Sequence, residues 1–89
     1  MKAVITVIGQ DKIGIIYNVT SVLAEYDVNI LDINQTIMNE LFTMIMVVDT
    51  SNMPVSFDEI QKKLEEKGSE IGVNIRIQDE GIFTAMSEL

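Results

Sequence analysis

Hydrophobic and polar residues alternate along the chain with a period that changes from segment to segment, and each change predicts a new element. Residues 2–8 carry apolar side chains on both faces of an extended chain, which predicts a central strand. Between residues 12 and 26 the apolar positions recur at helical spacing, so we expect a helix there. Residues 28–38 predict a strand with one apolar and one polar face, and residues 41–49 predict a second strand that is apolar on both faces. The first half of the chain therefore predicts a strand, a helix and a hairpin.

A second helix and a final strand follow a loop around Pro54, which cannot continue strand pairing. Ser56 and Glu59 have the spacing of a capping box, in which each side chain satisfies a backbone N–H group of the other residue. Gly72 has the position of a residue that ends this helix in a left-handed conformation. Residues 73–78 then alternate between apolar and polar side chains, and the polar face predicts a strand at the edge of a sheet.

The predicted order of elements is strand, helix, strand, strand, helix, strand, which corresponds to two split β-α-β units. Such units form an α+β fold, the ferredoxin-like βαββαβ sandwich, with an antiparallel sheet in the order 4-1-3-2 and two helices on one face. This order places the first and third strands in the middle, where strands with two apolar faces fit. We expect one domain over residues 1–78 and a C-terminal tail over residues 79–89. Apolar residues of the tail share one helical side (Ile82, Phe83 and Met86), but the tail is too short to be stable alone, so it must dock as a short helix or fray.

The overall composition limits the partners of the chain. Of its 89 residues, 47% are hydrophobic, a high share for so small a chain, so we expect exposed apolar surface on the monomer and self-association. The net charge of −8 argues against nucleic acid and anionic membranes as direct partners, because phosphate binding depends on Lys and Arg. No apolar run approaches the roughly 18–20 residues of a membrane span, and the N-terminus lacks the pattern of a secretion signal. We therefore expect a soluble, cytoplasmic protein.

The residue types offer little for catalysis. The sequence contains neither Cys nor His, which excludes thiol nucleophiles, disulfides, structural zinc and imidazole acid–base catalysis. No carboxylate pair stands in an evident apolar pocket. Met44 and Met46 fit core or interface packing better than a metal site, since methionine is an adaptable packing residue. We therefore expect no enzyme activity, no metal and no cofactor.

The turn between the first strand and the first helix, residues 9–16, is the stretch that most suggests a binding site. Its sequence contains neither the G-x-G-x-x-G dinucleotide pattern nor a P-loop. Asp11 suits the helix N-cap, where its carboxylate would accept from the N–H groups of Ile13 or Gly14, or else it faces a ligand. Gly9 can take backbone angles that are closed to other residues. Gly14 in the first helical turn costs roughly 1 kcal/mol relative to Ala, so it either packs the helix tightly on the sheet or lets a ligand or partner subunit approach the helix N-terminus.

With these residues in view, the chain resembles the ACT domain, a small-molecule-binding regulatory module. The resemblance rests on Gly9-x-Asp11-x-x-Gly14-Ile15 at the first turn and on Tyr26-Asp27-Val28-Asn29-Ile30 at the entry to the second strand. The tail from Asp79 to Met86 is similar to that of small stand-alone ACT proteins, a subgroup related to the two-domain glycine-cleavage repressor proteins. Many relatives have Arg-Pro where this chain has Lys12-Ile13, so the loop lacks a stiffening proline.

The resemblance implies a homodimer, often with the sheets joined side by side, that binds an amino acid at the subunit interface. The ligand-binding positions carried over from the family are Gly9, Asp11, Gly14, Ile15 and Asn29. Asp11 could pair with the ammonium of an amino acid, while free N–H groups at the helix start receive the carboxylate of the ligand. Asn29 offers both a donor and an acceptor, although Asn before a strand is also an ordinary turn residue.

Two functional hypotheses remain open at this stage. The first is a stand-alone ACT regulatory module that senses an amino-acid-like small molecule and signals to an unidentified protein partner. The alternative is a protein–protein interaction or dimerisation module without a metabolite ligand. Asp32, Asn34 and Thr36 fit either hypothesis, because they can form a solvated strand face or contact a partner subunit.

Overall fold

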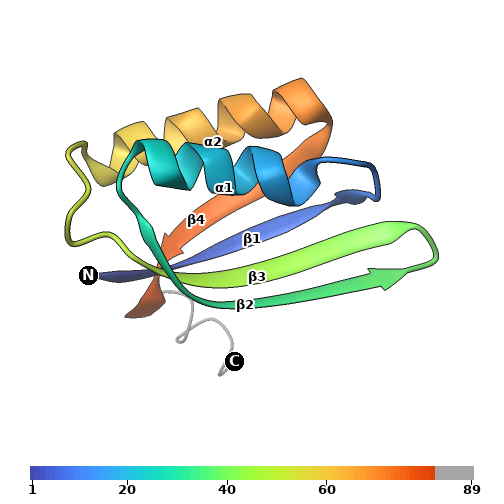
Figure 1. Ribbon diagram of the computed structural model, residues 1–89, viewed down its shortest axis with the longest axis horizontal. Coiled ribbons are helices and arrows are strands. Elements are labelled where there is room, and N and C mark those ends of the chain that lie inside the picture. Colours follow the sequence, from blue (N-terminus) through green and yellow to red (C-terminus); the bar gives the residue numbers. More distant parts are fainter. Residues whose placement is uncertain (82–89) are drawn as a thin grey trace.

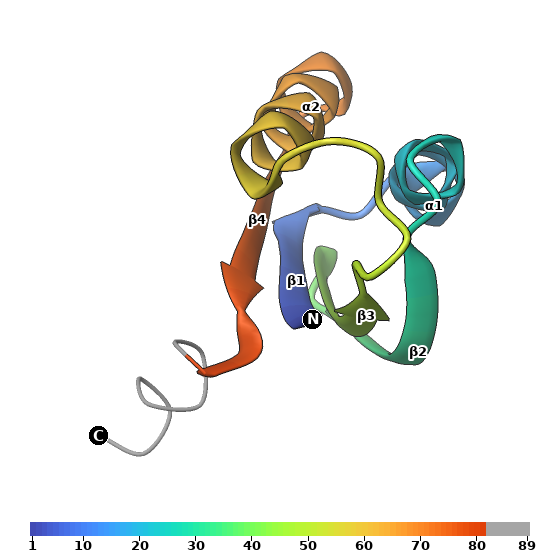
Figure 2. The same ribbon diagram turned by 90° about the vertical axis from the view of Figure 1, so that its left-hand side faces the viewer.

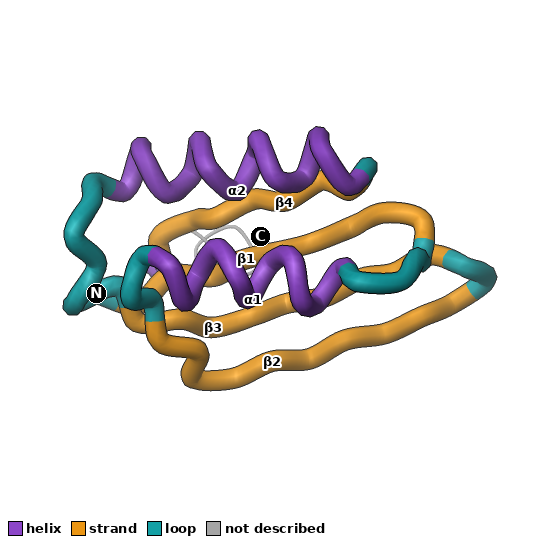
Figure 3. Tube along the Cα trace, turned by 45° about the horizontal axis from the view of Figure 1, so that its top comes forward, coloured by secondary structure: helices purple, strands orange, loops and turns teal. Residues whose placement is uncertain are grey.

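The computed structural model describes residues 1–81, and within them the elements follow the predicted order (Figure 1). The strands form one antiparallel sheet in the order β2-β3-β1-β4, so the predicted fold and strand order are confirmed. Both helices lie side by side on one face of this sheet (Figures 2 and 3). The elements are β1 (Lys2–Gln10), α1 (Ile15–Glu25), β2 (Asn29–Met38), β3 (Leu41–Asp49), α2 (Phe57–Ile71) and β4 (Val73–Asp79).

The hydrophobic core fills the space between the sheet and the two helices. The central strands β1 and β3 supply its floor, and both Met44 and Met46 are completely buried there, so their predicted packing role is confirmed. Val19 and Leu23 from α1 meet Ile60 and Leu64 from α2 above this floor. The core is therefore made by one face of each central strand, which leaves the second apolar face of β1 and β3 on the other side of the sheet.

The start of α1 differs from the prediction. Asp11 is not the N-cap, because the helix begins at Ile15 and Gly14 occupies the cap position with φ of 90°. Strand β1 continues to Gln10, and the next amide, that of Asp11, donates to the Glu40 carbonyl at 2.7 Å. This hydrogen bond ties the chain to the β2–β3 turn, so the helix cannot begin at residue 12. Gly14 therefore reverses the chain in a left-handed conformation and does not lie within the first helical turn.

Gly9 also has a different role from the one expected. Positive φ angles among the described glycines occur at Gly14 and Gly72, and Gly9 lies within the extended strand β1. A Cβ atom on Gly9 would stand 2.7 Å from Cγ1 of Val73 on the neighbouring strand β4. Gly9 is thus required by the close approach of two strands, and its backbone angles are ordinary.

Both predicted ends of α2 are confirmed. The Ser56 hydroxyl accepts a hydrogen bond from the Glu59 amide at 3.2 Å, as expected of an N-cap. Gly72 ends the helix with φ of 79°, and its amide donates to the Gly68 carbonyl at 2.8 Å. The following strand β4 is one residue longer than predicted and ends at Asp79.

Strand β2 forms an edge of the sheet and is more exposed than its alternating pattern suggests. It turns into β3 through Asn39 and Glu40, which both have positive φ angles, as a tight hairpin turn requires. The register shifts between Ile30 and Asp32, so Leu31 is an extra, bulged residue and does not share the pairing of the other apolar residues. The hairpin reaches beyond the start of α1 (Figure 1), and Ile37 on β2 remains 55% exposed.

The predicted C-terminal tail, residues 79–89, falls mostly outside the described residues. Its first residue, Asp79, ends β4, and the next two, Glu80 and Gly81, have helical conformation. The Asp79 carboxylate accepts a hydrogen bond from the Gly81 amide at 2.8 Å. The docked helix expected for the tail lies beyond these residues and stays a prediction.

Candidate functional site

A groove of about 350 Å³ lies where the start of α1 faces the β2–β3 hairpin. Its walls are the loop before α1, the first turn of α1, and residues of the two strands of the hairpin. Asp11, Gly14 and Ile15, three of the predicted site residues, line this groove together. The hairpin contributes the polar Gln35 and the apolar Ile37 and Phe42.

The helix start in this groove is held in place by its own backbone and by one side chain. The Gly14 carbonyl accepts from the Asn18 amide at 3.0 Å and from the Asn18 side-chain nitrogen at 2.7 Å. No side chain among residues 1–81 caps the N–H groups of the first turn, and that turn contains no acidic residue. A helix leaves its first N–H groups without intrahelical partners, and the helix dipole makes this end positive. The groove therefore offers amide donors to an anionic group.

Two residues of opposite charge, Asp11 and Lys12, line the groove. The Asp11 side chain is exposed, and within the described part of the chain its carboxylate accepts no hydrogen bond. Lys12 also lines the groove, and its Nζ lies 2.8 Å from the position that a Cβ on Gly72 would take. Its ammonium thus rests at the C-terminal end of α2, where the helix dipole is negative. Sequence reasoning noted Lys12 as a departure from the Arg-Pro pattern and missed its place in the groove.

The remaining predicted site residues lie elsewhere. Gly9 packs against Val73 and does not line the groove. Asn29 lies at the opposite end of α1, where it lines a second cavity of about 500 Å³. Tyr17 and Ile30 line that second cavity too, and Tyr17 also belongs to the first groove. Within one chain the structure brings together Asp11, Gly14 and Ile15 but separates them from Asn29.

The end of the molecule that carries Asn29 has the clearest electrostatic perturbation. Asn29 pairs with Asp49 across strands β2 and β3. Hydrogen bonds from the Ser51 hydroxyl and the Ser51 amide, at 2.6 and 2.9 Å, lower the pKa of Asp49 below its ordinary value of 3.8. The N-terminal ammonium lies 3.6 Å away and acts in the same direction. Asp49 is therefore a stable anion that fixes the β3–α2 connection beside Asn29.

Large apolar residues of α1, the loop before it and β2 are exposed to solvent. Ile13 is fully exposed in the loop before the helix, and Tyr17 on α1 is 73% exposed. Ile16 on α1 and Ile33 and Ile37 on β2 are exposed beside them. We call these five residues the α1–β2 surface. Of these residues, Ile16, Tyr17 and Ile37 line the groove at the start of α1 together.

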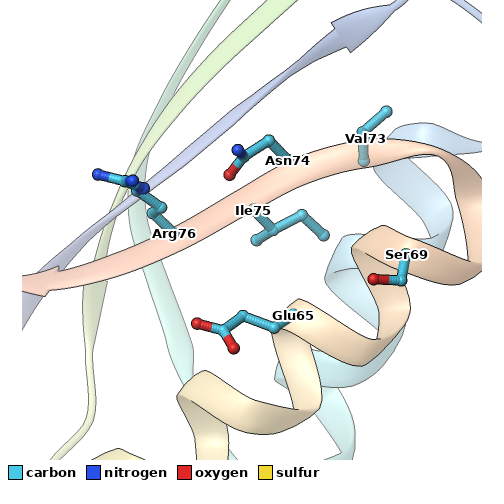
Figure 4. A pocket seen from close by; sticks show the side chains of 6 residues that line it. All are labelled: Glu65, Ser69, Val73, Asn74, Ile75 and Arg76. Carbon is cyan, nitrogen blue, oxygen red and sulfur yellow. The ribbon is translucent and has the colours of Figure 1, made fainter.

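Another cavity, of about 480 Å³, lies on the far side of the molecule between α2 and β4 (Figure 4). Glu65 and Ser69 extend from α2 on one side of β4, whereas Asn74 and Arg76 extend on the other side of this strand (Figure 4). These polar groups do not converge on one point, so this cavity is less suited to a small molecule than the groove at α1.

Among residues 1–81 no three acidic, His or Cys side chains are grouped so that they could hold a metal ion. Within the same residues no helix is long and apolar enough to span a bilayer.

Comparison with known proteins agrees with the architecture. A family model described as "ACT domain" matches residues 2–78. A UPF0237 protein from Clostridium acetobutylicum is 61% identical over 89 residues, which cover 100% of both chains. The solved structure of an ACT domain protein from Streptococcus pneumoniae superimposes with a TM-score of 0.82 at 43% identity and covers 93% of each chain.

Two further solved structures are similar at lower identity. The regulatory subunit of aspartate kinase from Thermus thermophilus has a TM-score of 0.67 at 26% identity, over 86% of this chain and 50% of that one. A putative glycine cleavage system transcriptional repressor has a TM-score of 0.73 at 23% identity, over 86% of this chain and 44% of that one, and so shares the fold.

Proposed function

The chain belongs to the ACT domain family, and on this premise we propose that it is a homodimeric regulatory module that binds an amino-acid-like small molecule at its subunit interface. The observation that carries the proposal is the groove at the start of α1, where uncapped amide groups lie beside the Asp11 carboxylate. The similarity to the regulatory subunit of aspartate kinase supports a regulatory role. The proposal includes no catalytic step, and it places the protein in the cytoplasm.

The groove suits a zwitterion. The N–H groups of the first turn of α1 can receive the ligand carboxylate, because the positive end of the helix dipole lies there. The Asp11 carboxylate can receive the ligand ammonium, and it is free to do so because it does not cap the helix. The volume of about 350 Å³ lies within the range of roughly 300–1,000 Å³ that is usual for small-molecule sites. Apolar walls from Ile37 and Phe42 can receive the side chain of the ligand.

A two-fold dimer would explain why Asn29 lies far from the groove. In an isologous interface the same surface of each subunit packs against its copy in reversed direction. If the α1–β2 surface forms that interface, the Gly14 end of one helix comes next to the Asn29 end of the other. Each complete site would then combine Asp11 and Gly14 of one subunit with Asn29 of its partner. A specific interface needs about 800 Å² per subunit.

In this proposal, signalling results from thermodynamic coupling between ligand binding and the geometry of the dimer. A ligand that bridges two subunits stabilises the dimer geometry in which its contacts are complete. Coupling of this kind typically amounts to about 1–3 kcal/mol, which is enough to change the affinity for a protein partner several-fold.

The alternative function is a dimerisation or protein-interaction module without a metabolite. Fully exposed Ile13 and exposed Tyr17 favour it, because large apolar side chains are frequent contact residues in protein interfaces. In that case the groove would remain empty, and the same surface would serve the contact alone.

A thermal-shift screen of the full chain against the common amino acids separates the two functions. Ligand at 100 times its Kd stabilises the native state by about 2.7 kcal/mol. In a domain of this size that corresponds to a rise in Tm of about 10–20 °C. Asp11→Asn should remove most of the shift, whereas Glu66→Gln, which removes one exposed carboxylate on α2, should retain it. No shift with any amino acid at millimolar concentration would favour the interaction module.

A further inference from the structure

The side of the sheet that faces away from the two helices, which we call the outer face, carries exposed apolar side chains (Figures 2 and 3). Every second residue of β1 and β3 points into the core, so the residues between them lie on the outer face. Among these, Ile8, Leu41 and Ile45 are each between 41% and 49% exposed. The centre of the outer face is thus apolar and open to solvent.

The outer face is electrically balanced, although the chain as a whole has a net charge of −8. Lys2 and Asp49 pair with each other on this face. The other ionisable residues that the described strands place there are Arg76 on β4 and Asp32 on β2. The excess of acidic residues therefore lies outside the outer face. Two copies of the chain can approach through this face without the repulsion that arises between acidic surfaces.

Arg76 and Asp32 lie at opposite edges of the outer face. The strands β1 and β3 separate β4 from β2, so the two residues are about 14 Å or more apart at roughly 4.8 Å per strand. Both side chains are exposed. Arg76 pairs with Thr6 at the middle of β1, and the same level of the sheet contains Ile45 on β3 and Asn34 on β2. Asp32 is two residues along β2 from that level.

This arrangement of charges complements itself under one kind of two-fold axis. Sheets that pack face to face often keep their strands within about 30° of each other. A two-fold axis along the strands places β4 of one copy over β2 of the other, so Arg76 lies above Asn34 and within reach of Asp32. An axis across the middle of the strands would instead place β4 over β4 and bring the two Arg76 side chains together. Charge therefore favours the axis along the strands.

The same axis brings the apolar centres of the two faces together. It places β3 of one copy over β1 of the other, so Ile45 lies above Thr6, between Val4 and Ile8 of the other copy. The nine residues of β1 and the four strands span roughly 30 by 19 Å at about 3.3 Å per residue and 4.8 Å per strand. Side chains that stand out of this plane add to its accessible area, so the face is large enough for a specific interface of about 800 Å² per subunit.

We propose that the outer face binds the outer face of a second copy of the chain, with Arg76 of each copy paired with Asp32 of the other. The α1–β2 surface stays free in this arrangement. Together with a homodimer formed through the α1–β2 surface, it gives a tetramer with two kinds of isologous interface. The inference does not depend on the binding of any ligand, and it would hold for a pure interaction module as well.

Reversal of the two charges tests the pairing, because Arg76 and Asp32 are too far apart to meet within one chain. Arg76→Asp places two carboxylates together at each contact, and Asp32→Arg places two guanidinium groups together. In sedimentation velocity, each single variant should raise the dissociation constant of the outer-face contact by roughly tenfold or more. The double variant restores opposite charges between the copies and keeps the net charge of the parent chain, so it should associate as the parent does. Association of the double variant no stronger than that of the single variants would contradict the proposed pairing.

Ile45→Lys tests the apolar centre of the outer face. It introduces a cation into the contact, so light scattering at micromolar concentration should give half the mass of the parent assembly, whether or not the α1–β2 surface is also an interface. Ser69→Lys adds the same charge at an exposed position on α2 and should keep the parent mass. Circular dichroism verifies that each variant is folded.

Two results of this measurement would overturn the proposal. One is a monomeric parent chain at micromolar concentration. The other is a folded Ile45→Lys chain with the mass of the parent assembly, in which case any cover of the outer face would come from within the chain or from a different protein.

Discussion

Substitution of Gly14 tests the backbone geometry on which the groove depends. Gly14 has φ of 90° and ψ of 4°, a left-handed conformation that costs an ordinary L-residue about 1–2 kcal/mol. A Cβ at this position would meet no atom closer than the Asn18 side-chain nitrogen at 3.4 Å, so the cost is conformational and not steric. Gly14→Ala should therefore lower the free energy of unfolding by about 1–2 kcal/mol without displacing its neighbours.

The matched control at this position is Gly14→Asn. Asn adopts left-handed angles more readily than Ala because its side chain hydrogen-bonds locally, so it should recover a large part of the lost stability. Urea denaturation followed by circular dichroism measures both variants, and the denaturant slope should stay constant while the midpoint shifts. If Gly14→Ala is as stable as the parent chain, or if Asn is no better than Ala, the helix does not start as described.

Two further substitutions test the packing and the charge network. Gly68→Ala should lower the free energy of unfolding, measured by urea denaturation, by about 1–3 kcal/mol, because the added Cβ would lie 2.6 Å from the Val73 carbonyl oxygen. Helix propensity alone would predict that Ala stabilises the protein by about 1 kcal/mol. A stabilisation of this kind would show that α2 packs differently. Because the pKa of Asp49 is lowered in the folded state, its interaction with Ser51 stabilises the protein above the ordinary pKa of 3.8 and is lost as the pH falls through the folded pKa. The Tm of the Asp49→Asn variant should therefore decrease less steeply than that of the parent chain as the pH is lowered. If the two decrease equally, Asp49 does not have the role given to it.

The fold was predictable because its signals are periodic and redundant. Two-sided apolar patterns identified β1 and β3 as central strands, and the strand order then followed from the order of elements. The ends of α2 were predictable because Ser56 and Gly72 have distinct capping chemistry. Such signals depend on residues that are close together in the sequence, so one amino-acid sequence is enough to reveal them.

The start of α1 was not predictable from local preference. Asp11 is a good N-cap residue, and Gly14 three residues later is compatible either with a first turn or with a left-handed cap. The choice is made by a contact that is distant in sequence, the hydrogen bond from the Asp11 amide to the Glu40 carbonyl. The requirement for Gly9 likewise comes from Val73 on another strand. The sequence pattern therefore indicates that glycine is required at these positions, but it does not indicate which contact or backbone conformation requires it.

The candidate site was predictable in part. Asp11, Gly14 and Ile15 line one groove, as residues that lie so close together in the sequence are expected to do. Asn29 was placed with them by family resemblance, and within one chain it lies at the other end of α1. In the proposed dimer, Asn29 would join these residues from the partner subunit, and a contact between two chains leaves no periodic signal in the sequence of one.

A complementation experiment tests the shared site most directly. Asp11→Asn and Asn29→Ala chains are mixed in equal amounts, exchanged through mild denaturant, and titrated by calorimetry with the amino acid that gives the greatest shift in Tm. If each site combines Asp11 of one subunit with Asn29 of the other, each variant alone loses binding, and the mixture recovers about one quarter of the parent sites, because half of the dimers are hybrids with one intact site of two. No recovery on mixing, or full binding by the Asn29→Ala chain alone, would contradict a site built by two subunits.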